Sequence, residues 1–180
     1  MTVDEQKKEL RKIIRELKSQ IPLDEKMRRS ELIFKSVEKT DSFEGAKTIM
    51  LYWSMDDEVQ THNVVEKWYL KKTIILPVVS GDKLILKKYS GEQNMKTGQS
   101  YGIMEPIGEE FTDLNSIDLI IVPGVAFDKS NNRMGRGKAY YDKLLTSTKA
   151  VKIGVCFDFQ YFESIPCDKY DVKMDQIIIG

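Results

Sequence analysis

The stretch IDLIIVPG, residues 117–124, is a short, uninterrupted apolar run that ends in Pro-Gly. Similar runs are TIMLYWS (48–54), TIILPVV (73–79), VKIGVCFD (151–158) and QIIIG (176–180), and segments with helical patterns separate most of them. Strands that are apolar throughout and alternate with helices are typical of a parallel sheet covered on both faces. We therefore predict an α/β fold, a three-layer α/β/α sandwich with a mostly parallel, Rossmann-like sheet.

Local signals predict the helices before the first strand. In residues 2–21 apolar side chains recur at helical spacing, and Thr2 with Glu5 forms a capping-box pair. We predict a second helix that is capped by Asp24 and runs to about Lys39. In sheets of this kind ligands bind beyond the carboxyl ends of the strands. The loops that follow the strands are therefore the first places to look for a site.

Length and composition predict a single soluble domain over residues 1–180, long enough to bury a core. Lysine plus arginine and aspartate plus glutamate both number 28, which disfavours a protein that binds nucleic acid or membranes over its whole surface. The N-terminus is charged from the start, and no apolar run approaches the roughly 18 residues of a membrane span. We expect a cytoplasmic monomer whose partners are small molecules, with no nucleic acid and no membrane.

The sequence offers few residues for metal sites or nucleophilic catalysis. Cys156 and Cys167 are too far apart for a CxxC or zinc motif. The single histidine, His62, excludes multi-histidine metal sites, and its place at the start of a predicted helix favours a surface or capping role. We expect chemistry that uses no imidazole.

The segment NNRMGRGKAYYDKLL, residues 131–145, has the features of a phosphate cradle. Gly135 and Gly137 let the backbone approach a ligand, and the helix that follows directs free N–H groups toward an anion. Asp142 could coordinate Mg²⁺ on bound phosphates. The motif is neither a Walker A loop nor a Rossmann GxGxxG, so the loop alone would favour a solvated basic turn. The three cations that precede the tyrosine pair, which could grip phosphate oxygens, are Arg133, Arg136 and Lys138.

Taken together, five motifs resemble the 5-formyltetrahydrofolate cyclo-ligase family, also called 5,10-methenyltetrahydrofolate synthetase. They occur in the family's order and span nearly the whole chain. The block over 118–145 is long and specific, whereas the first motif alone would carry no weight. The motifs are KKELR (7–11), SMDDEVQT (54–61), YGIMEP (101–106), DLIIVPGVAFDKSNNRMGRGKAYYDKLL (118–145) and YDVKMDQIII (170–179).

The resemblance implies that 5-formyltetrahydrofolate and ATP give 5,10-methenyltetrahydrofolate, ADP and phosphate, with Mg²⁺ as cofactor. In the family's reaction the formyl oxygen attacks the γ-phosphate and the folate's own N10 then closes the ring. Both nucleophiles belong to the substrate, so the protein mainly positions them and neutralises charge. A chain with one histidine suits such a reaction.

The resemblance also implies residue roles at matching positions. Catalytic roles fall to Arg133, Arg136, Lys138 and Tyr140. Metal binding falls to Asp142 and Asp171, although each aspartate alone would more often be a cap or a surface charge. The implied ATP-binding residues are Lys7, Arg11, Arg133, Met134, Gly135, Arg136, Gly137, Lys138, Ala139, Tyr140 and Tyr141.

The implied folate-binding residues are Trp53, Glu58, Arg136 and Tyr140. A carboxylate such as Glu58 can accept two N–H bonds from the amino-pyrimidine edge of a pterin, and Trp53 offers an apolar wall. Both have a structural alternative, because Glu58 would favour a helix dipole and Trp53 could belong to the core.

One position departs from the family pattern. Where relatives commonly have glycine before the tyrosine pair, this chain has Ala139. Residues 137–145 have a helical pattern, so we predict a helical position at which alanine is neutral or better. A position that needed positive φ would instead make alanine cost about 1 kcal/mol.

Two other functions fit parts of the sequence. A non-catalytic folate- or RNA-binding protein of the same fold would use the basic loop, but RNA binding needs neither Asp142 nor Asp171. A sugar-phosphate isomerase or acyl-transfer enzyme would use the same loop, but it needs a proton-shuttling or nucleophilic residue that the sequence does not clearly supply.

Overall fold

The computed structural model describes all residues, 1–180, and is built around one six-stranded sheet. The strand order is β11-β9-β6-β1-β2-β3, and every neighbouring pair is parallel except the hairpin of β2 and β3. The predicted α/β fold with a mostly parallel sheet is thereby confirmed. The strands are β1 (Thr48–Met50), β2 (Thr73–Ser80), β3 (Lys83–Lys88), β6 (Leu119–Val122), β9 (Val151–Cys156) and β11 (Gln176–Ile179).

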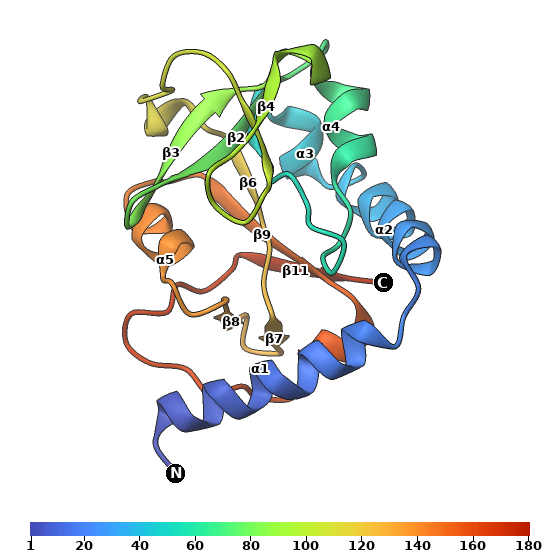
Figure 1. The fold of residues 1–180 in the computed structure, drawn as a ribbon, viewed down its shortest axis with the longest axis vertical. Coiled ribbons are helices and arrows are strands. Elements are labelled where there is room, and N and C mark those ends of the chain that lie inside the picture. The colour runs from blue at the N-terminus through green and yellow to red at the C-terminus, as the bar shows by residue number, and fades with distance from the viewer.

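Helices cover both faces of this sheet, as Figure 1 shows, with α2, α3 and α4 on one side and α5 on the other. Successive side chains of a strand point to opposite faces, so a strand that is covered on both faces must be apolar at every position. Ile49 of β1 packs with the cluster around α2, and Met50 packs with the cluster that includes Leu145 of α5. The helices are α1 (Val3–Ser19), α2 (Leu23–Val37), α3 (Asp41–Gly45), α4 (His62–Trp68) and α5 (Tyr140–Leu145).

Helix α1 lies across the bottom of the molecule in Figure 1, beside small strands that follow β6 and β9. Its residue Ile14 is buried with Val125, Ala126 and Met134 in a separate apolar cluster. The small strands are β7 (Ala126–Asp128), β8 (Arg133–Met134) and β10 (Tyr161–Phe162), and a separate hairpin is formed by β4 (Met95–Thr97) and β5 (Met104–Pro106). Short 3₁₀ turns occur at η1 (Glu92–Asn94), η2 (Leu114–Ser116) and η3 (Asp158–Gln160). No helix has the length and apolar character needed to cross a membrane.

Of the two predicted helix caps, one is confirmed and one is wrong. The capping box of Thr2 and Glu5 at the start of α1 is confirmed. The predicted cap Asp24 is wrong: α2 is preceded by Pro22 and has no side-chain cap, while Asp24 lies in the first turn, where it still favours the helix dipole.

The first strand is shorter than its apolar run: β1 ends at Met50, whereas the run continues to Ser54. The Thr61 hydroxyl donates to the Tyr52 carbonyl, and Ser54 and Thr61 exchange two further hydrogen bonds between backbone N–H and side-chain oxygen. A side chain therefore satisfies the backbone that a neighbouring strand would otherwise pair. The chain turns here into the loop over 54–61.

Candidate active site

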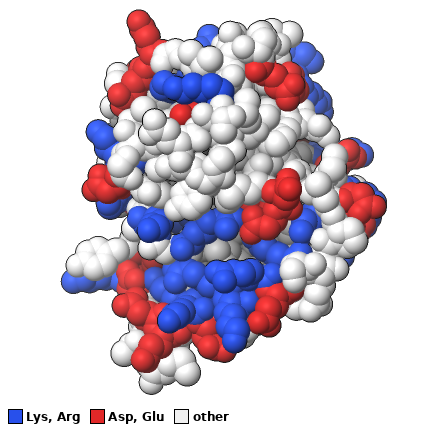
Figure 2. Space-filling view, viewed as in Figure 1, with Lys and Arg blue, Asp and Glu red and all other residues white.

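A cavity of about 820 Å³ opens at the carboxyl ends of β1 and β6. Parts of the chain that are far apart in sequence line it: α1, the loop after β1, the loop after β6, the start of α5 and the segment over 168–171. Figure 2 shows Lys and Arg side chains gathered across the lower half of the visible face, with Asp and Glu around them. The overall charge is balanced, but this face carries the local basic patch that an anionic ligand requires.

All but one of the sequence-predicted site residues line this cavity. The exception is Met134, which is buried in the apolar cluster with Ile14 and whose carbonyl accepts from the Val125 N–H. The side chain of Met134 therefore supports the loop from behind. The predicted residues brought together are Lys7, Arg11, Trp53, Glu58, Arg133, Gly135, Arg136, Gly137, Lys138, Ala139, Tyr140, Tyr141, Asp142 and Asp171.

Arg133 is fixed at the base of the cavity, with 4% of its side chain exposed. Its Nε donates to the Pro123 carbonyl at 2.8 Å, and its Nη1 lies 3.4 Å from Asp142 Oδ1. Burial lowers the pKa of the guanidinium, although the neighbouring Asp142 opposes this effect. An arginine remains charged under these conditions, so Arg133 contributes a rigid positive charge.

The two glycines of the loop are needed for different reasons. A Cβ on Gly135 would lie 2.9 Å from Arg133 Nη2, closer than real contacts allow. The Gly135 carbonyl accepts from Arg11 Nε at 2.9 Å, which ties α1 to the loop. Gly137 has φ +98°, a left-handed conformation that favours glycine. Gly135 thus leaves room for Arg133, whereas Gly137 is needed for its backbone conformation, because a Cβ there would meet Arg11 at an ordinary 3.5 Å.

The expectation that Ala139 is helical is wrong. Ala139 has φ 55° and ψ 19° in the left-handed region, and α5 begins only at Tyr140. Its carbonyl accepts from the Lys143 N–H, so Ala139 caps the helix through its backbone without a side-chain bond. A left-handed position is where glycine is preferred, and an L-residue there costs energy. The periodic pattern placed the helix start too early because it cannot detect this turn.

Lys7 and two aspartates form a tight ion cluster at one end of the cavity. Lys7 Nζ donates to Asp168 at 2.7 Å and to Asp171 at 2.5 Å, and only 7% of the Lys7 side chain is exposed. Burial alone would lower the pKa of Lys7, but these bonds raise it overall. The hydrogen bond from Lys7 lowers the pKa of Asp168. Both partners are therefore charged across the neutral range.

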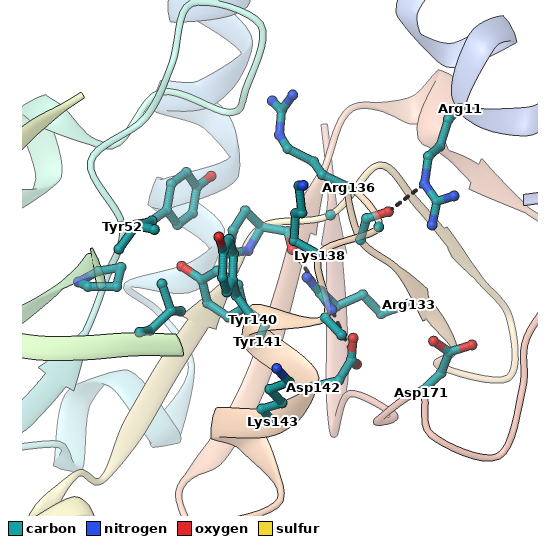
Figure 3. Close-up of a pocket in the computed structure, with 18 of the residues that line it drawn as sticks. Arg11, Tyr52, Arg133, Arg136, Lys138, Tyr140, Tyr141, Asp142, Lys143 and Asp171 are labelled. Carbon is teal, nitrogen blue, oxygen red and sulfur yellow. Dashed lines mark hydrogen bonds and ion pairs between the residues drawn. The ribbon is translucent and has the colours of Figure 1, made fainter. Parts of the chain in front are cut away.

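Asp142 and Asp171 approach the same side of the cavity. Asp142 Oδ1 accepts from the N–H of Val172, the residue after Asp171. In Figure 3 both carboxylates lie below Arg133. No cluster of three or more His, Cys, Asp or Glu side chains suited to a metal ion occurs in the structure. Mg²⁺ commonly takes only one or two protein carboxylates and completes its shell with substrate phosphates and water, so this pair of oxygen donors fits it.

Glu58 occupies the opposite side, in the loop after β1. Its Oε2 accepts from the Met55 N–H at 2.9 Å, its Oε1 accepts from Arg136 Nη2 at 3.2 Å, and 12% of its side chain is exposed. Burial raises the pKa of the carboxyl, although Arg136 opposes this. Glu58 is thus a buried acceptor that an arginine holds in place.

Trp53 and His62 form a stacked pair behind Glu58. Their ring centroids are 3.9 Å apart, and His62 Nε2 lies 3.1 Å from the Ser54 carbonyl. Burial lowers the pKa of His62. His62 does begin α4, but it is partly buried rather than a surface cap, and its ring braces a wall of the cavity.

Sequence reasoning missed several residues of this region. Asp168, Tyr101 and Tyr170 line the cavity, and Tyr101 has φ 61° at the tip of the β4–β5 hairpin. Asp57 and Lys18 join Arg136 in an ion-pair network. Tyr101, Tyr170 and Asp57 lie in the recognised motifs, where no role was assigned to them. Lys18 lies seven positions after Arg11 and therefore on the same helix face, whereas Asp168 carried no signal.

The fold and the site define an α/β protein with a cation-lined cavity at the carboxyl ends of its strands. The model described as "5-formyltetrahydrofolate cyclo-ligase family" matches residues 3–180, and the chain belongs to this family.

Similar proteins carry the family's name. A 5-formyltetrahydrofolate cyclo-ligase of Haemophilus influenzae is 33% identical over 144 residues, which is 75% of this chain and 76% of that protein. One of Mus musculus is 28% identical over 99% of this chain and 95% of that protein. The NMR structure of Aquifex aeolicus 5,10-methenyltetrahydrofolate synthetase superposes with a TM-score of 0.86 at 34% identity, covering 96% of this chain and 89% of that chain.

Proposed function

We propose that this protein converts 5-formyltetrahydrofolate to 5,10-methenyltetrahydrofolate at the expense of ATP, in the cavity between α1, the loop over 54–61 and the start of α5. The observation that carries the proposal is that one cavity gathers the residues implied for both substrates. Its volume of about 820 Å³ is within the range of ligand sites. Family membership supplies the reaction.

The nucleotide phosphates would bind between α1 and the loop over 131–139. Arg11 and Arg133 each use Nε to hold a backbone carbonyl, and Arg133 Nη1 also pairs with Asp142. Both terminal nitrogens of Arg11 and Nη2 of Arg133 would therefore be available to phosphate oxygens. Lys138 lines the same space. Fixed cations of this kind stabilise charge on a transferring phosphoryl group without reorganising first.

A Mg²⁺ ion would be held by Asp142 and Asp171 and would neutralise part of the phosphate charge when bound. Lys7 now contacts Asp171 and lines the cavity, and it would turn toward a bound phosphate instead. Lys7 would then serve the nucleotide while Asp171 serves the metal. Asp142, Asp171 and Lys7 thus fit a nucleotide bound together with a metal ion better than they fit the nucleotide or the metal ion alone.

The folate would bind at the other end, against Trp53 and Glu58. Glu58 has one oxygen on the Met55 N–H and the other on Arg136, so its carboxylate plane is fixed for the amino-pyrimidine edge of a pterin. Tyr140 extends the wall from the start of α5. This arrangement would place the formyl group between the pterin side and the phosphate side.

The reaction then needs no nucleophile from the protein. The formyl oxygen forms a bond to the γ-phosphorus, and the bond to ADP breaks. N10 next attacks the activated formyl carbon and loses its proton, and the C–O bond breaks to release phosphate that carries the former formyl oxygen. Arg133, Arg136 and Lys138 would stabilise the charge that develops on the phosphoryl oxygens.

The competing acyl-transfer hypothesis lacks a cysteine, a serine and a histidine base among the residues that line the cavity. Cys156 is fully buried in the sheet, and burial raises the pKa of its thiol to about 12. Cys167 does not line the cavity, and the His62 ring is stacked on Trp53. A reaction in which both nucleophiles come from the substrate suits this site better.

The test is direct. Purified protein is mixed with 5-formyltetrahydrofolate, ATP and Mg²⁺, and the absorbance of the methenyl product is followed, with reactions lacking ATP as blanks. We expect product only with ATP, and a loss of at least about a hundredfold in kcat for Arg133→Gln, because its charge is desolvated. Folded wild-type protein that forms no product would refute the proposal.

A further inference from the structure

Arg136 is anchored across the cavity by a single corner of its guanidinium. Its Nη2 contacts Asp57 Oδ1 at 2.7 Å, Asp57 Oδ2 at 3.0 Å and Glu58 Oε1 at 3.2 Å. Its Nε and Nη1 make no hydrogen bond to the protein. Three of the five N–H groups of the guanidinium therefore remain free, although its position is already fixed by the carboxylates.

Asp57 has a second cation on its other side. Lys18 of α1 lies with its Nζ 3.6 Å from Asp57 Oδ2, and 6% of its side chain is exposed. A buried ammonium without an opposite charge is costly, so Lys18 and Asp57 depend on each other. Both Lys18 and Arg136 lower the pKa of Asp57, against the raising effect of its burial. Asp57 is thus a charged bridge between α1 and the loop that carries Arg136.

The loop that carries Asp57 is itself braced. Gln60 Nε2 donates to the carbonyls of Met55 and Glu58, and the Gln60 N–H donates to the Ser30 hydroxyl of α2. The carboxylate of Asp57 is therefore held from its backbone as well as from its two cations. Such bracing restricts the orientations that Arg136 can adopt before any ligand arrives.

In Figure 3 Arg136 extends away from Arg133 and Asp142, which lie lower in the view. The two arginines of the loop thus extend in different directions from the loop. Arg133 is fixed by buried backbone, whereas Arg136 is 47% exposed and is fixed only by carboxylates. Its orientation depends on Asp57 far more than the orientation of Arg133 depends on any one side chain.

We propose that Asp57, oriented by the buried Lys18, is a positioning residue that holds the guanidinium of Arg136 ready to grip an anionic group of a bound ligand. A guanidinium held in its productive orientation loses less conformational entropy when it binds phosphate oxygens. Asp57 need not touch the substrate, because it acts through Arg136. This inference rests on the proposed function for the identity of the ligand, but not for the geometry of the network.

The test is a double-mutant cycle on Asp57 and Arg136. The variants are Asp57→Asn, Arg136→Gln and the double substitution, with Asp56→Asn as a matched control because Asp56 is exposed and makes no hydrogen bond or ion pair. Lys18→Met tests the second cation and removes a buried charge at similar side-chain volume. The measurements are kcat/KM for the cyclisation and the calorimetric Kd of a non-hydrolysable ATP analogue with Mg²⁺.

A positioning role predicts non-additive effects. Asp57→Asn should weaken kcat/KM or analogue binding about tenfold in the wild-type background, and should have no further effect once Arg136 is Gln. Lys18→Met should have a smaller effect in the same direction, and Asp56→Asn none. Additive losses, or a loss at Asp57 no larger than at Asp56, would overturn the inference.

The same data separate this inference from the proposed reaction. Wild-type protein that binds the analogue but forms no product would refute the cyclisation, and the binding cycle would still decide the role of Asp57. Wild-type protein that is active but shows an additive cycle would refute the positioning role alone. Protein that neither binds the analogue nor forms product would refute both.

Discussion

Lys7, in the first turns of α1, donates to Asp171, which lies 164 positions further along the chain, at 2.5 Å. This contact and the one from Arg11 to the Gly135 carbonyl attach the first helix to both sides of the cavity. A helix that would otherwise be a solvated amphipathic segment thus forms a wall of the site. In the proposed function Lys7 would exchange Asp171 for a phosphate oxygen, whereas Arg11 would keep the Gly135 carbonyl.

Replacing Lys7 tests this wall. We expect Lys7→Met to raise the KM for ATP at least about tenfold, because a charged contact to phosphate is lost, and to leave the KM for folate largely unchanged. Lys8→Met is the control, because Lys8 is the exposed neighbour on α1. Equal changes in both KM values would contradict the placement of Lys7 at the nucleotide.

The effect of Lys7→Met on the free energy of unfolding should depend on pH. The pKa of Asp168 is lowered in the folded protein by the hydrogen bond from Lys7, so this pairing stabilises the fold above the ordinary pKa of 3.8 and is lost as the pH falls through the lowered value. The pKa of Lys7 is raised, so its own contribution persists through neutral pH and is lost only in strongly alkaline solution. Urea unfolding should show a gap between wild type and Lys7→Met that is constant near neutral pH and shrinks below about pH 4. A gap that grows in acid would contradict the pairing.

Glu58 should make folate binding sensitive to acid. Burial raises the pKa of its carboxyl, and the neighbouring charge of Asp57 raises it further. Three groups oppose this rise without cancelling it, namely Arg136, the Met55 N–H and Lys18. Only the ionised carboxylate accepts two N–H bonds from a pterin, so affinity should fall with decreasing pH from a point above the ordinary value of 4.5. Calorimetric titration across this range should show the decline in the wild type and a flat, weaker profile in Glu58→Gln. An equally steep decline in the variant would assign the titration to another group.

Asp142 should matter for the metal–nucleotide pair rather than for folate. Asp142→Asn keeps an oxygen for the Val172 N–H but loses the charge that faces Arg133. We expect the apparent affinity for Mg²⁺-ATP to fall at least about tenfold, with folate binding largely kept. Separate titrations of ATP, Mg²⁺ and folate check this, and a variant that loses only folate binding would reverse the assigned roles.

Ala139→Gly should stabilise the protein. Ala139 is left-handed, at φ 55°, so glycine would remove a backbone cost of about 1 kcal/mol. The control is Ala46→Gly: Ala46 has an ordinary φ of −69°, so glycine should destabilise there. Urea unfolding measures both, and effects of the same sign would show that the left-handed turn is not the cause.

Much of the fold could be predicted because its signals are local. Thr2 and Glu5 lie three positions apart, and the apolar run through Ile120 and Ile121 marks a strand buried on both faces. The end of the first strand at Met50 could not be predicted, because it depends on the distant hydroxyl of Thr61. Apolar periodicity carries no information on such side-chain-to-backbone bonds.

The candidate site was predictable only where a motif marked it. Arg136 and Glu58 lie in recognisable motifs, and Asp57 lies in the same motif as Glu58. The motif does not show that Asp57 pairs with Arg136 and with Lys18, because those pairings depend on how the folded chain places α1. The left-handed Ala139 was missed for a related reason: helical spacing continues through it, although the backbone does not. Pairings between distant segments and single φ angles arise only once the chain is folded.

The transfer of the formyl oxygen tests the central claim most directly. Substrate labelled with heavy oxygen in the formyl group would be incubated with the protein, ATP and Mg²⁺, and the released phosphate analysed by mass spectrometry. We predict one labelled phosphate for each methenyltetrahydrofolate formed, because the formyl oxygen becomes bonded to the γ-phosphorus before the ring closes. Unlabelled phosphate, or product formed without ATP consumption, would contradict the account.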